Sequence, residues 1–291
     1  MNTQFLNYLR CPACHGKMSR LRGALVCGAC NKRWNIQSGI PILVDLSVLP
    51  EHLSKQVAYF EKEDQSRAVW RLEQWQERYV ENFLSWGKPK QKGLIMDNAA
   101  GSGYMTVELA RRGFRIIATD LTVAELIKLK HVVTSLGLDE NVLLVCCDSQ
   151  KLPLAASVAD GLVANAILEH LPDEKQAVAE ITRVVKPKAP VMVAMPIAYH
   201  LLLPFLWLPN WIHDLRIGHL RRYTRQSILE AFTHFTEVRT YYTGHLLKVV
   251  CLFLYVVTKR SRWNALGERL DRVFETVPYG ANNVVSVLKK R

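Results

Sequence analysis

Residues 94–103 read Leu94-Ile95-Met96-Asp97-Asn98-Ala99-Ala100-Gly101-Ser102-Gly103, a short apolar run that leads into a turn of small residues. The apolar run is typical of a buried strand, and residues 105–112 have the pattern of a helix. Small residues at such a turn let the backbone approach a ligand closely, and the helix start adds free amide groups and a positive dipole end. The turn is therefore a candidate ligand-binding turn, although glycine-rich turns also occur for packing alone.

Strands and helices alternate along the chain after this turn. We expect strands at 94–96, 114–119, 142–147, 161–165, 191–195, 237–242 and 283–288, with helices at 105–112, 122–136 and 173–185. Strands that alternate with helices form a mostly parallel sheet with helices on both faces. The fold class predicted is α/β, a doubly wound sheet.

Three successive strands bring an acidic residue to the carboxyl edge of this sheet. Asp97 ends the first strand, Asp120 the second and Asp148 the third. Open α/β sheets bind ligands at this edge. There Asp120 could accept hydrogen bonds from both hydroxyls of a ribose, and Asp148 could meet a ligand amino group. Each aspartate alone could be a helix cap, but three in succession favour a ligand site.

With these residues, segment 93–240 resembles the class I S-adenosylmethionine-dependent methyltransferases, in the small-molecule branch known as methyltransferase type 11. The resemblance extends to three further stretches, Asp148-Ser149-Gln150-Lys151-Leu152-Pro153, Ala159-Asp160-Gly161-Leu162-Val163 and Ala166-Ile167-Leu168-Glu169-His170-Leu171. It implies a Rossmann-like sheet of seven strands and S-adenosylmethionine as the cofactor.

The resemblance also implies roles for individual residues. Residues 95–103 would wrap the methionine end and ribose, Asp120 would hold the ribose, and Asp148 with Ser149 would contact the adenine. The implied cofactor-binding residues are Asp97, Asn98, Ala99, Gly101, Gly103, Asp120, Leu121, Asp148, Ser149 and Asn165. The family usually has glycine where this chain has Ala99, and the added methyl group would narrow the turn.

Four cysteines near the start of the chain form the pairs Cys11-Pro12-Ala13-Cys14 and Cys27-Gly28-Ala29-Cys30, with twelve residues between them. Two such turns aim four thiolates at one point, so this spacing predicts a zinc ribbon. Because protein fills all four positions, we expect the Zn²⁺ to be structural. The ribbon, including Gly39-Ile40-Pro41, resembles the small zinc-ribbon partners of tRNA methyltransferases. It is less similar to the zinc module of an rRNA guanine methyltransferase group.

The domain boundaries follow from these patterns. We expect the zinc ribbon at 1–46, a helical linker or cap at 47–92 and the methyltransferase domain at 93–291. Two apolar insertions, at 199–225 and 244–277, do not belong to the minimal fold. Both apolar runs are too short to cross a bilayer.

Basic residues flank both insertions. They are Arg216, Arg221, Arg222 and Arg225 near the first, and Lys259, Arg260, Arg262, Arg269 and Arg272 near the second. An apolar surface edged by basic residues suits an anionic membrane, but a hydrophobic lid over the active site explains the pattern equally well. Both alternatives favour a small apolar or lipid-linked acceptor, whose phosphate the arginines could bind.

His170, His219 and Tyr223 are the candidate general bases. The stretch from Gly218 to Thr224, which contains two of them, resembles one that recurs in methyltransferases of glycan, lipid and natural-product pathways. Because the cofactor supplies the activated methyl group, the protein mainly positions the acceptor and removes a proton. Alternatively, His170 caps a helix and His219 is a packing residue.

Charge and cysteine content limit the partners and the compartment. The net charge of +12 favours an anionic partner. The seven cysteines form no disulfide framework, and the first residues have no apolar signal core. We therefore expect a cytoplasmic protein, for which a peripheral contact with the inner face of the membrane is open. RNA is a weaker candidate partner, because the basic residues do not gather on the ribbon. The oligomeric state is not determined by the sequence.

The sequence thus predicts an S-adenosylmethionine-dependent methyltransferase that acts on a small apolar or lipid-linked acceptor, at oxygen. Two alternatives stay open. One is a tRNA or rRNA methyltransferase that grips RNA with its zinc ribbon. The other is a non-catalytic scaffold or activator of another methyltransferase, against which Asp97, Asp120 and Asp148 argue.

Overall fold

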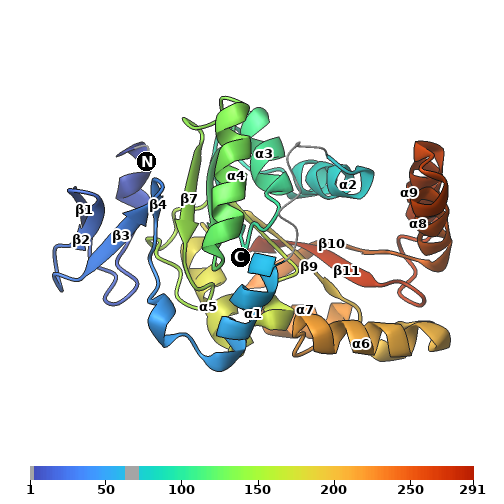
Figure 1. Cartoon of the computed structure of the whole chain (residues 1–291). Helices are drawn as coiled ribbons and strands as arrows, with labels where there is room; N and C mark the ends of the chain where they lie inside the picture. Colours follow the sequence, from blue (N-terminus) through green and yellow to red (C-terminus); the bar gives the residue numbers. More distant parts are fainter. Residues whose placement is uncertain (1–2, 63–71) are drawn as a thin grey trace.

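The computed structural model describes residues 3–62 and 72–291, and its centre is a seven-stranded sheet in the order β10-β11-β9-β8-β5-β6-β7 (Figure 1). All neighbouring strands are parallel except β11, which is antiparallel to both β9 and β10. The strands are β5 (Leu94–Asn98), β6 (Arg115–Asp120), β7 (Val142–Cys146), β8 (Gly161–Asn165), β9 (Pro190–Pro196), β10 (Phe235–Thr243) and β11 (Asn283–Lys290). This arrangement confirms the predicted fold class.

Helices cover both faces of the sheet. Adjacent residues of a strand point to opposite faces, so Ile95 and Met96 of β5 belong to two separate hydrophobic clusters. One face packs against α3 (Tyr104–Arg111) and α4 (Val123–Ser135), and the other against α5 (Glu174–Val184) and α7 (Arg225–Ala231). Burial on both sides explains why the parallel strands read as continuous apolar runs.

The N-terminal segment forms a small four-stranded antiparallel sheet that docks on the edge strand β7 (Figure 1). Its strands are β1 (Met18–Leu21), β2 (Ala24–Cys27), β3 (Arg33–Gln37) and β4 (Ile40–Pro41). Just after β4, the Leu43 amide donates to the Cys146 carbonyl at 2.7 Å, and the Arg10 amide donates to the Pro153 carbonyl at 2.8 Å. The small sheet therefore covers an edge that would otherwise expose unpaired backbone groups.

The described part of residues 47–92 contains the two α-helices α1 (Glu51–Lys62) and α2 (Gln74–Asn82) and a π-helical turn, η3 (Phe83–Gly87), and residues 63–71 lie outside it. The Gln56 side chain of α1 donates to the Ile217 carbonyl at 2.8 Å. Arg78 of α2 is almost fully buried and pairs with Asp271 at 3.0 Å. These contacts attach the two helices to the apolar insertions.

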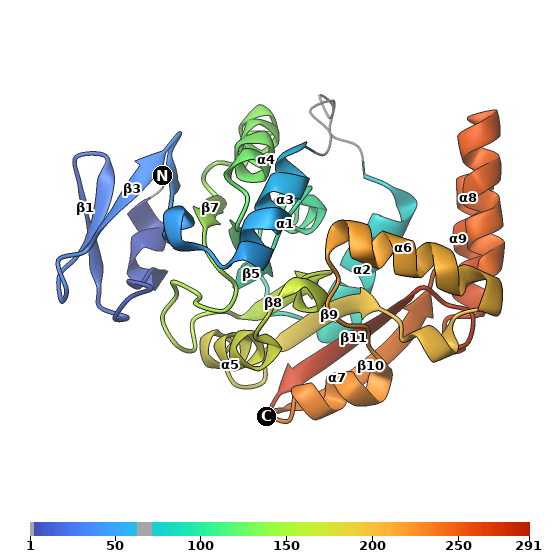
Figure 2. The same ribbon diagram turned by 60° about the horizontal axis from the view of Figure 1, so that its bottom comes forward.

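The insertions form helices at the end of the molecule away from the small sheet (Figures 1 and 2). The first insertion contains α6 (Trp207–Ile217), and the second contains α8 (Leu246–Thr258) and α9 (Ser261–Val273). Gly267 of α9 lets the last two helices pack closely, because a Cβ there would lie 2.9 Å from Cβ of Cys251. Within residues 3–62 and 72–291, no helix combines the length and the apolar character that a membrane span requires.

Candidate functional site

The turn after β5 has a backbone that favours small residues. Gly101 and Gly103 have φ values of +49° and +73°. A Cβ on Gly103 would lie 2.1 Å from Cδ1 of Leu129, so this position requires glycine. Ala99 also lies in the left-handed region, at φ +58°. That conformation costs about 1–2 kcal/mol for an L-residue with a side chain, which gives a physical reason for the glycine usual in the resembling family.

Two aspartates lie against this turn, Asp97 buried and Asp120 half-buried. Asp120, the last residue of β6, accepts hydrogen bonds from the Gly101 and Thr122 amides, both at 2.9 Å. Asp97 in β5 accepts one from the Thr106 hydroxyl at 2.6 Å. Burial raises the pKa of both carboxyls, that of Asp97 to about 6 with a smaller contribution from the nearby Asp120. The structure thus brings together the first two aspartates singled out in the sequence.

Polar side chains connect the ends of three neighbouring strands. The Asn98 side-chain oxygen accepts from the Thr119 hydroxyl at 3.1 Å and from the Ser149 hydroxyl at 2.9 Å. The Asn98 Nδ2 and the Asn165 Oδ1 are buried and have no hydrogen-bond partner. An unpaired buried polar atom is costly, so both atoms fit a site that a polar ligand completes.

Asp148 and Leu121 lie at the same edge of the sheet. The Asp148 carboxylate accepts from the Gln150 amide at 2.8 Å and from the Gln150 side chain. Leu121 directly follows Asp120 and is half-buried. All of the expected cofactor-binding residues therefore lie on β5, β6 or β8, or on the turns that follow β5, β6 and β7.

The two candidate histidines lie side by side although they are distant in sequence. His170 follows β8 and His219 follows α6, and their ring centroids are 4.7 Å apart. His219 Nδ1 is 2.8 Å from Oδ1 of Asp214. Burial and the neighbouring His219 lower the pKa of His170 to about 3, and burial also lowers the pKa of His219. Both rings are therefore neutral near neutral pH.

Sequence reasoning missed two acidic residues beside these histidines, Glu169 and Asp214. The Glu169 carboxylate is fully buried, and burial raises its pKa to about 8. An acidic residue inside the apolar stretch 166–171 was the signal that could have revealed Glu169. Asp214 could not be found in this way, because α6 also carries Asn210, His213 and Arg216, so one more polar residue does not stand out.

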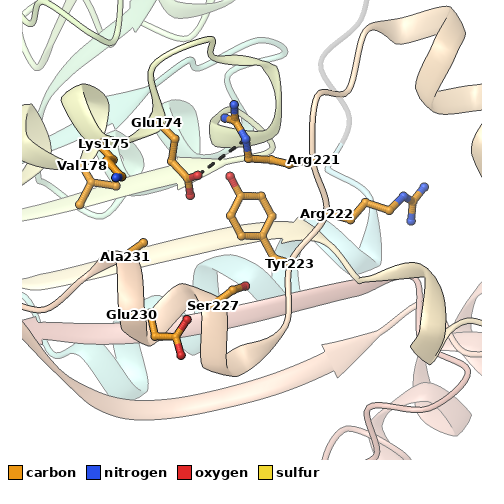
Figure 3. A pocket seen from close by; sticks show the side chains of 9 residues that line it. All are labelled: Glu174, Lys175, Val178, Arg221, Arg222, Tyr223, Ser227, Glu230 and Ala231. Atoms are coloured by element: carbon orange, nitrogen blue, oxygen red, sulfur yellow. Dashed lines mark ion pairs between the residues drawn. The ribbon is translucent and has the colours of Figure 1, made fainter.

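Tyr223, the third candidate base, lines a cavity of about 470 Å³ between α5 and α7 (Figure 3). Its hydroxyl points toward Glu174, and burial raises the pKa of Tyr223. Arg221 pairs with Glu174 at 3.7 Å and donates to the carbonyls of Leu168 and Leu171. The other lining residues are Lys175, Val178, Arg222, Ser227, Glu230 and Ala231. None of the expected cofactor-binding residues lines this cavity.

Three of the four arginines expected near the first insertion already pair with carboxylates of the protein. Arg221 is held as described, Arg222 pairs with Asp214 at 2.6 Å, and Arg225 pairs with Glu237. Arg216 is exposed. The expectation that this group binds a phosphate is therefore weakened, since three of its members already neutralise carboxylates.

The four N-terminal cysteines form a compact cluster, with all four sulfurs within 4.8 Å of one another. The sulfurs of Cys11 and Cys30 are 3.8 Å apart, and those of Cys14 and Cys27 are 3.4 Å apart. A tetrahedral zinc site with Zn–S bonds of about 2.3 Å has sulfurs about 3.8 Å apart. The donor set and its dimensions therefore fit one tetrathiolate metal ion.

Known proteins resemble the part of the chain that contains the turn after β5. Residues 96–193 match the family model described as a methyltransferase domain. Demethylmenaquinone methyltransferase from Corynebacterium urealyticum is 30% identical over 100 residues, which cover 34% of this chain and 40% of that protein. The enzyme of that name from Corynebacterium efficiens is 33% identical over 107 residues, covering 37% and 42%. The matches thus span about two fifths of these relatives.

Among solved structures, the geranyl diphosphate C-methyltransferase from Streptomyces coelicolor has a similar fold. Its TM-score is 0.62, with 12% sequence identity, and the match covers 83% of this chain and 98% of that one. Identity this low speaks for the fold alone. Together, these comparisons identify residues 96–193 as a methyltransferase domain, within a fold that solved methyltransferase structures share.

Proposed function

We propose that the protein transfers a methyl group from S-adenosylmethionine to oxygen of an apolar, lipid-linked acceptor. The observation that carries the proposal is the meeting of Asp97, Asn98, Asp120 and Ser149 around one glycine-containing turn at the carboxyl edge of the sheet. The class of acceptor is supported by the demethylmenaquinone methyltransferases among the relatives, whose name denotes a quinone substrate.

The residues present fit the cofactor. Asp120 would accept hydrogen bonds from the ribose hydroxyls, and Asp148 with Ser149 would contact the adenine. The unpaired Asn98 Nδ2 and Asn165 Oδ1 offer one donor and one acceptor to its polar groups. When bound, the cofactor supplies an activated methyl group, so that the protein needs only to orient the acceptor and allow its proton to leave.

We place the reacting hydroxyl of the acceptor beside the paired rings of His170 and His219. These rings follow β8 and α6, on the side of the sheet edge next to the apolar insertion. The hydroxyl would lose its proton next to these rings. Tyr223 keeps its own proton because its pKa is raised, so it could donate a hydrogen bond to an acceptor oxygen.

The test is the fate of a labelled methyl group. The full-length protein is incubated with methyl-labelled S-adenosylmethionine and a bacterial extract, which is then separated into lipid, RNA and protein fractions. We expect the label in the lipid fraction. Label in RNA would instead favour the tRNA or rRNA alternative, and failure to bind S-adenosylmethionine in calorimetry would favour the scaffold alternative.

We also propose that the cysteine cluster holds one structural zinc ion. Four thiolates leave no coordination position open for water or substrate, so this ion would stabilise the small sheet and take no part in the reaction. The small sheet packs on β7, and Phe5, Leu9 and Leu25 of the N-terminal segment share one hydrophobic cluster with residues of the large sheet. Loss of the ion would therefore affect the large domain as well.

A lipid-linked acceptor requires access to a membrane, and α8 has the surface for it. Its outer face exposes Leu247, Val250, Phe253 and Val257, the last two by 66% and 63%. Exposed basic residues follow at the end of α8 and along α9, namely Lys259, Arg260, Arg262, Arg269 and Arg272. We propose that this face lies on an anionic bilayer.

We expect the double substitution Phe253→Ser and Val257→Ser to weaken binding to phosphatidylglycerol-containing vesicles at least tenfold. Complete burial of one such side chain in the bilayer would contribute about 1.5–3 kcal/mol to the free energy of binding. A loss of 1.4 kcal/mol corresponds to a tenfold weaker affinity. Vesicle cosedimentation measures the effect. The matched control is Val48→Ser, which removes a side chain that is 72% exposed in the N-terminal segment. Equal binding by the double variant and the control would contradict the proposed contact.

A further inference from the structure

Three side chains with metal-binding atoms meet just beyond the end of β8. One ligand atom from each of Glu169, His170 and His219 lies within 4.8 Å of the other two. Two of these residues belong to the turn after β8, and the third belongs to the segment after α6. His52 of α1 covers the group, with its Nε2 at 2.9 Å from the His170 carbonyl oxygen. The cluster is thus a buried site made of two distant segments.

Several polar atoms of this cluster lack hydrogen-bond partners. Both carboxylate oxygens of Glu169 and the Nδ1 of His170 are buried and have no hydrogen-bond partner. The Nε2 of His219 is 3.9 Å from Oε1 of Glu169, too long for a hydrogen bond. A buried carboxylate without partners is strongly unfavourable unless a cation or a proton compensates it. Either a proton or a bound cation must therefore compensate this carboxyl group.

The environment of His219 prepares it as a ligand. Its Nδ1 is bound to Asp214, which fixes the proton on that nitrogen and leaves the lone pair of Nε2 directed at Glu169. A carboxylate that orients a ligating histidine in this way is the usual outer shell of a protein metal site. Asp214 is itself held by Arg222 and by the Tyr199 hydroxyl.

The charges of the neighbourhood are consistent with this role. Arg222 is buried and forms two contacts with Asp214, at 2.6 and 2.7 Å, so this pair is neutral as a unit. Arg221 donates to backbone carbonyls and pairs with Glu174 at 3.7 Å. Glu169 is then the one acidic group of the three-residue cluster, and no arginine in the described part of the chain pairs with it, so a cation that displaces its proton finds an unpaired carboxylate.

We propose that Glu169, His170 and His219 bind a divalent transition-metal ion. Two imidazole nitrogens with one carboxylate suit Zn²⁺, Fe²⁺, Co²⁺ or Mn²⁺, whereas Mg²⁺ and Ca²⁺ prefer oxygen ligands alone. Three protein ligands leave coordination positions open, in contrast to the four thiolates of the ribbon. We place the ion on the acceptor side of the site, because nine of the ten expected cofactor-binding residues lie on β5, β6 or the turns after β5, β6 and β7, and only Asn165 lies on β8.

The inference rests on the proposed function and specifies how the acceptor is activated. A hydroxyl oxygen bound to the ion loses its proton to water more easily, because the metal stabilises the resulting anion. The two histidines then hold the ion and do not take up the proton. Acceptors with a hydroxyl group, and above all those with a second oxygen next to it, would bind best.

Mn²⁺ is the probe that separates this site from the ribbon, because thiolate ligands do not favour it. Titration of the full-length zinc-loaded protein, followed by electron paramagnetic resonance, should show about one bound Mn²⁺ per chain. Glu169→Gln keeps the shape of the side chain and removes its charge, and His219→Ala removes a ligand. Loss of a residue that only orients a ligand weakens metal binding about 10- to 100-fold. Because Glu169 and His219 would contact the ion directly, we expect each variant to weaken Mn²⁺ binding by more than this.

The matched control is His213→Ala, which removes an exposed ring 6.0 Å from His219 that is not part of the cluster. This variant should bind Mn²⁺ as the unmodified protein does. Circular dichroism and the affinity for S-adenosylmethionine show whether Glu169→Gln and His219→Ala are folded. Lack of Mn²⁺ binding by the unmodified protein, or unchanged binding by folded Glu169→Gln, would overturn the inference. Mn²⁺ binding without any affinity for S-adenosylmethionine would instead overturn the proposed function and leave the metal site standing.

Discussion

Asp120→Ala is expected to weaken the binding of S-adenosylmethionine about 10- to 100-fold. Hydrogen bonds to a charged group contribute about 1.5–3 kcal/mol, and 1.4 kcal/mol corresponds to a factor of ten. The Asp120 carboxylate is held in place by the Gly101 and Thr122 amides, so it is oriented before the ligand arrives. Isothermal titration calorimetry measures the loss directly.

Two further variants make this result specific. Asp139→Ala removes the same charge from an exposed position and should leave the affinity unchanged. Asp120→Asn keeps the shape and one acceptor oxygen, so it should fall between Asp120→Ala and the unmodified protein. Thermal unfolding checks that the turn after β5 keeps its structure when the bond to Gly101 is lost. Unchanged affinity in a folded Asp120→Ala variant would rule out the ribose as the partner of this carboxylate.

The fold was predictable because the apolar runs of the sequence coincide with buried strands. The strand expected at 161–165 is β8 (Gly161–Asn165), and the helix expected at 173–185 is α5 (Glu174–Val184). The strand expected at 94–96 extends two residues further, through Asp97 and Asn98, because both pair with residues of β6. Apolar character marks where a strand is buried, but it cannot show how far the backbone pairing continues into polar residues.

The gathering of the expected cofactor-binding residues was also predictable from the sequence, because parallel strands necessarily bring their carboxyl ends to one edge. The acceptor side was not. His170 and His219 were singled out separately, and their contact depends on how the chain folds back after α6. The charge on Arg222 was expected to face a ligand, but it neutralises Asp214 instead. Pairings between distant segments of this kind leave no trace in local sequence patterns.

Cys27→Ser is expected to reduce the zinc content by about one ion per chain and to unfold the N-terminal sheet. A serine hydroxyl does not supply the thiolate that zinc requires here, and the Cys27 sulfur is buried 3.4 Å from that of Cys14. Structural zinc ions contribute about 10–16 kcal/mol to the folding of small zinc-binding peptides. The packing of a small four-stranded sheet cannot replace this much folding free energy. Atomic emission spectrometry measures the zinc, and limited proteolysis should then cleave within residues 1–46.

The consequence should extend to the large sheet, because residues of the N-terminal segment cover β7. Without the bond from Leu43 to Cys146, this strand exposes backbone groups that can pair with another molecule. We therefore expect Cys27→Ser to aggregate on mild heating, as light scattering would show, while its affinity for S-adenosylmethionine persists at low temperature. Cys251→Ser is the control, since this buried cysteine lies in α8, away from the cluster, and its loss should leave the zinc content unchanged. Full zinc content in Cys27→Ser would show that these sulfurs do not hold the ion, whatever their spacing.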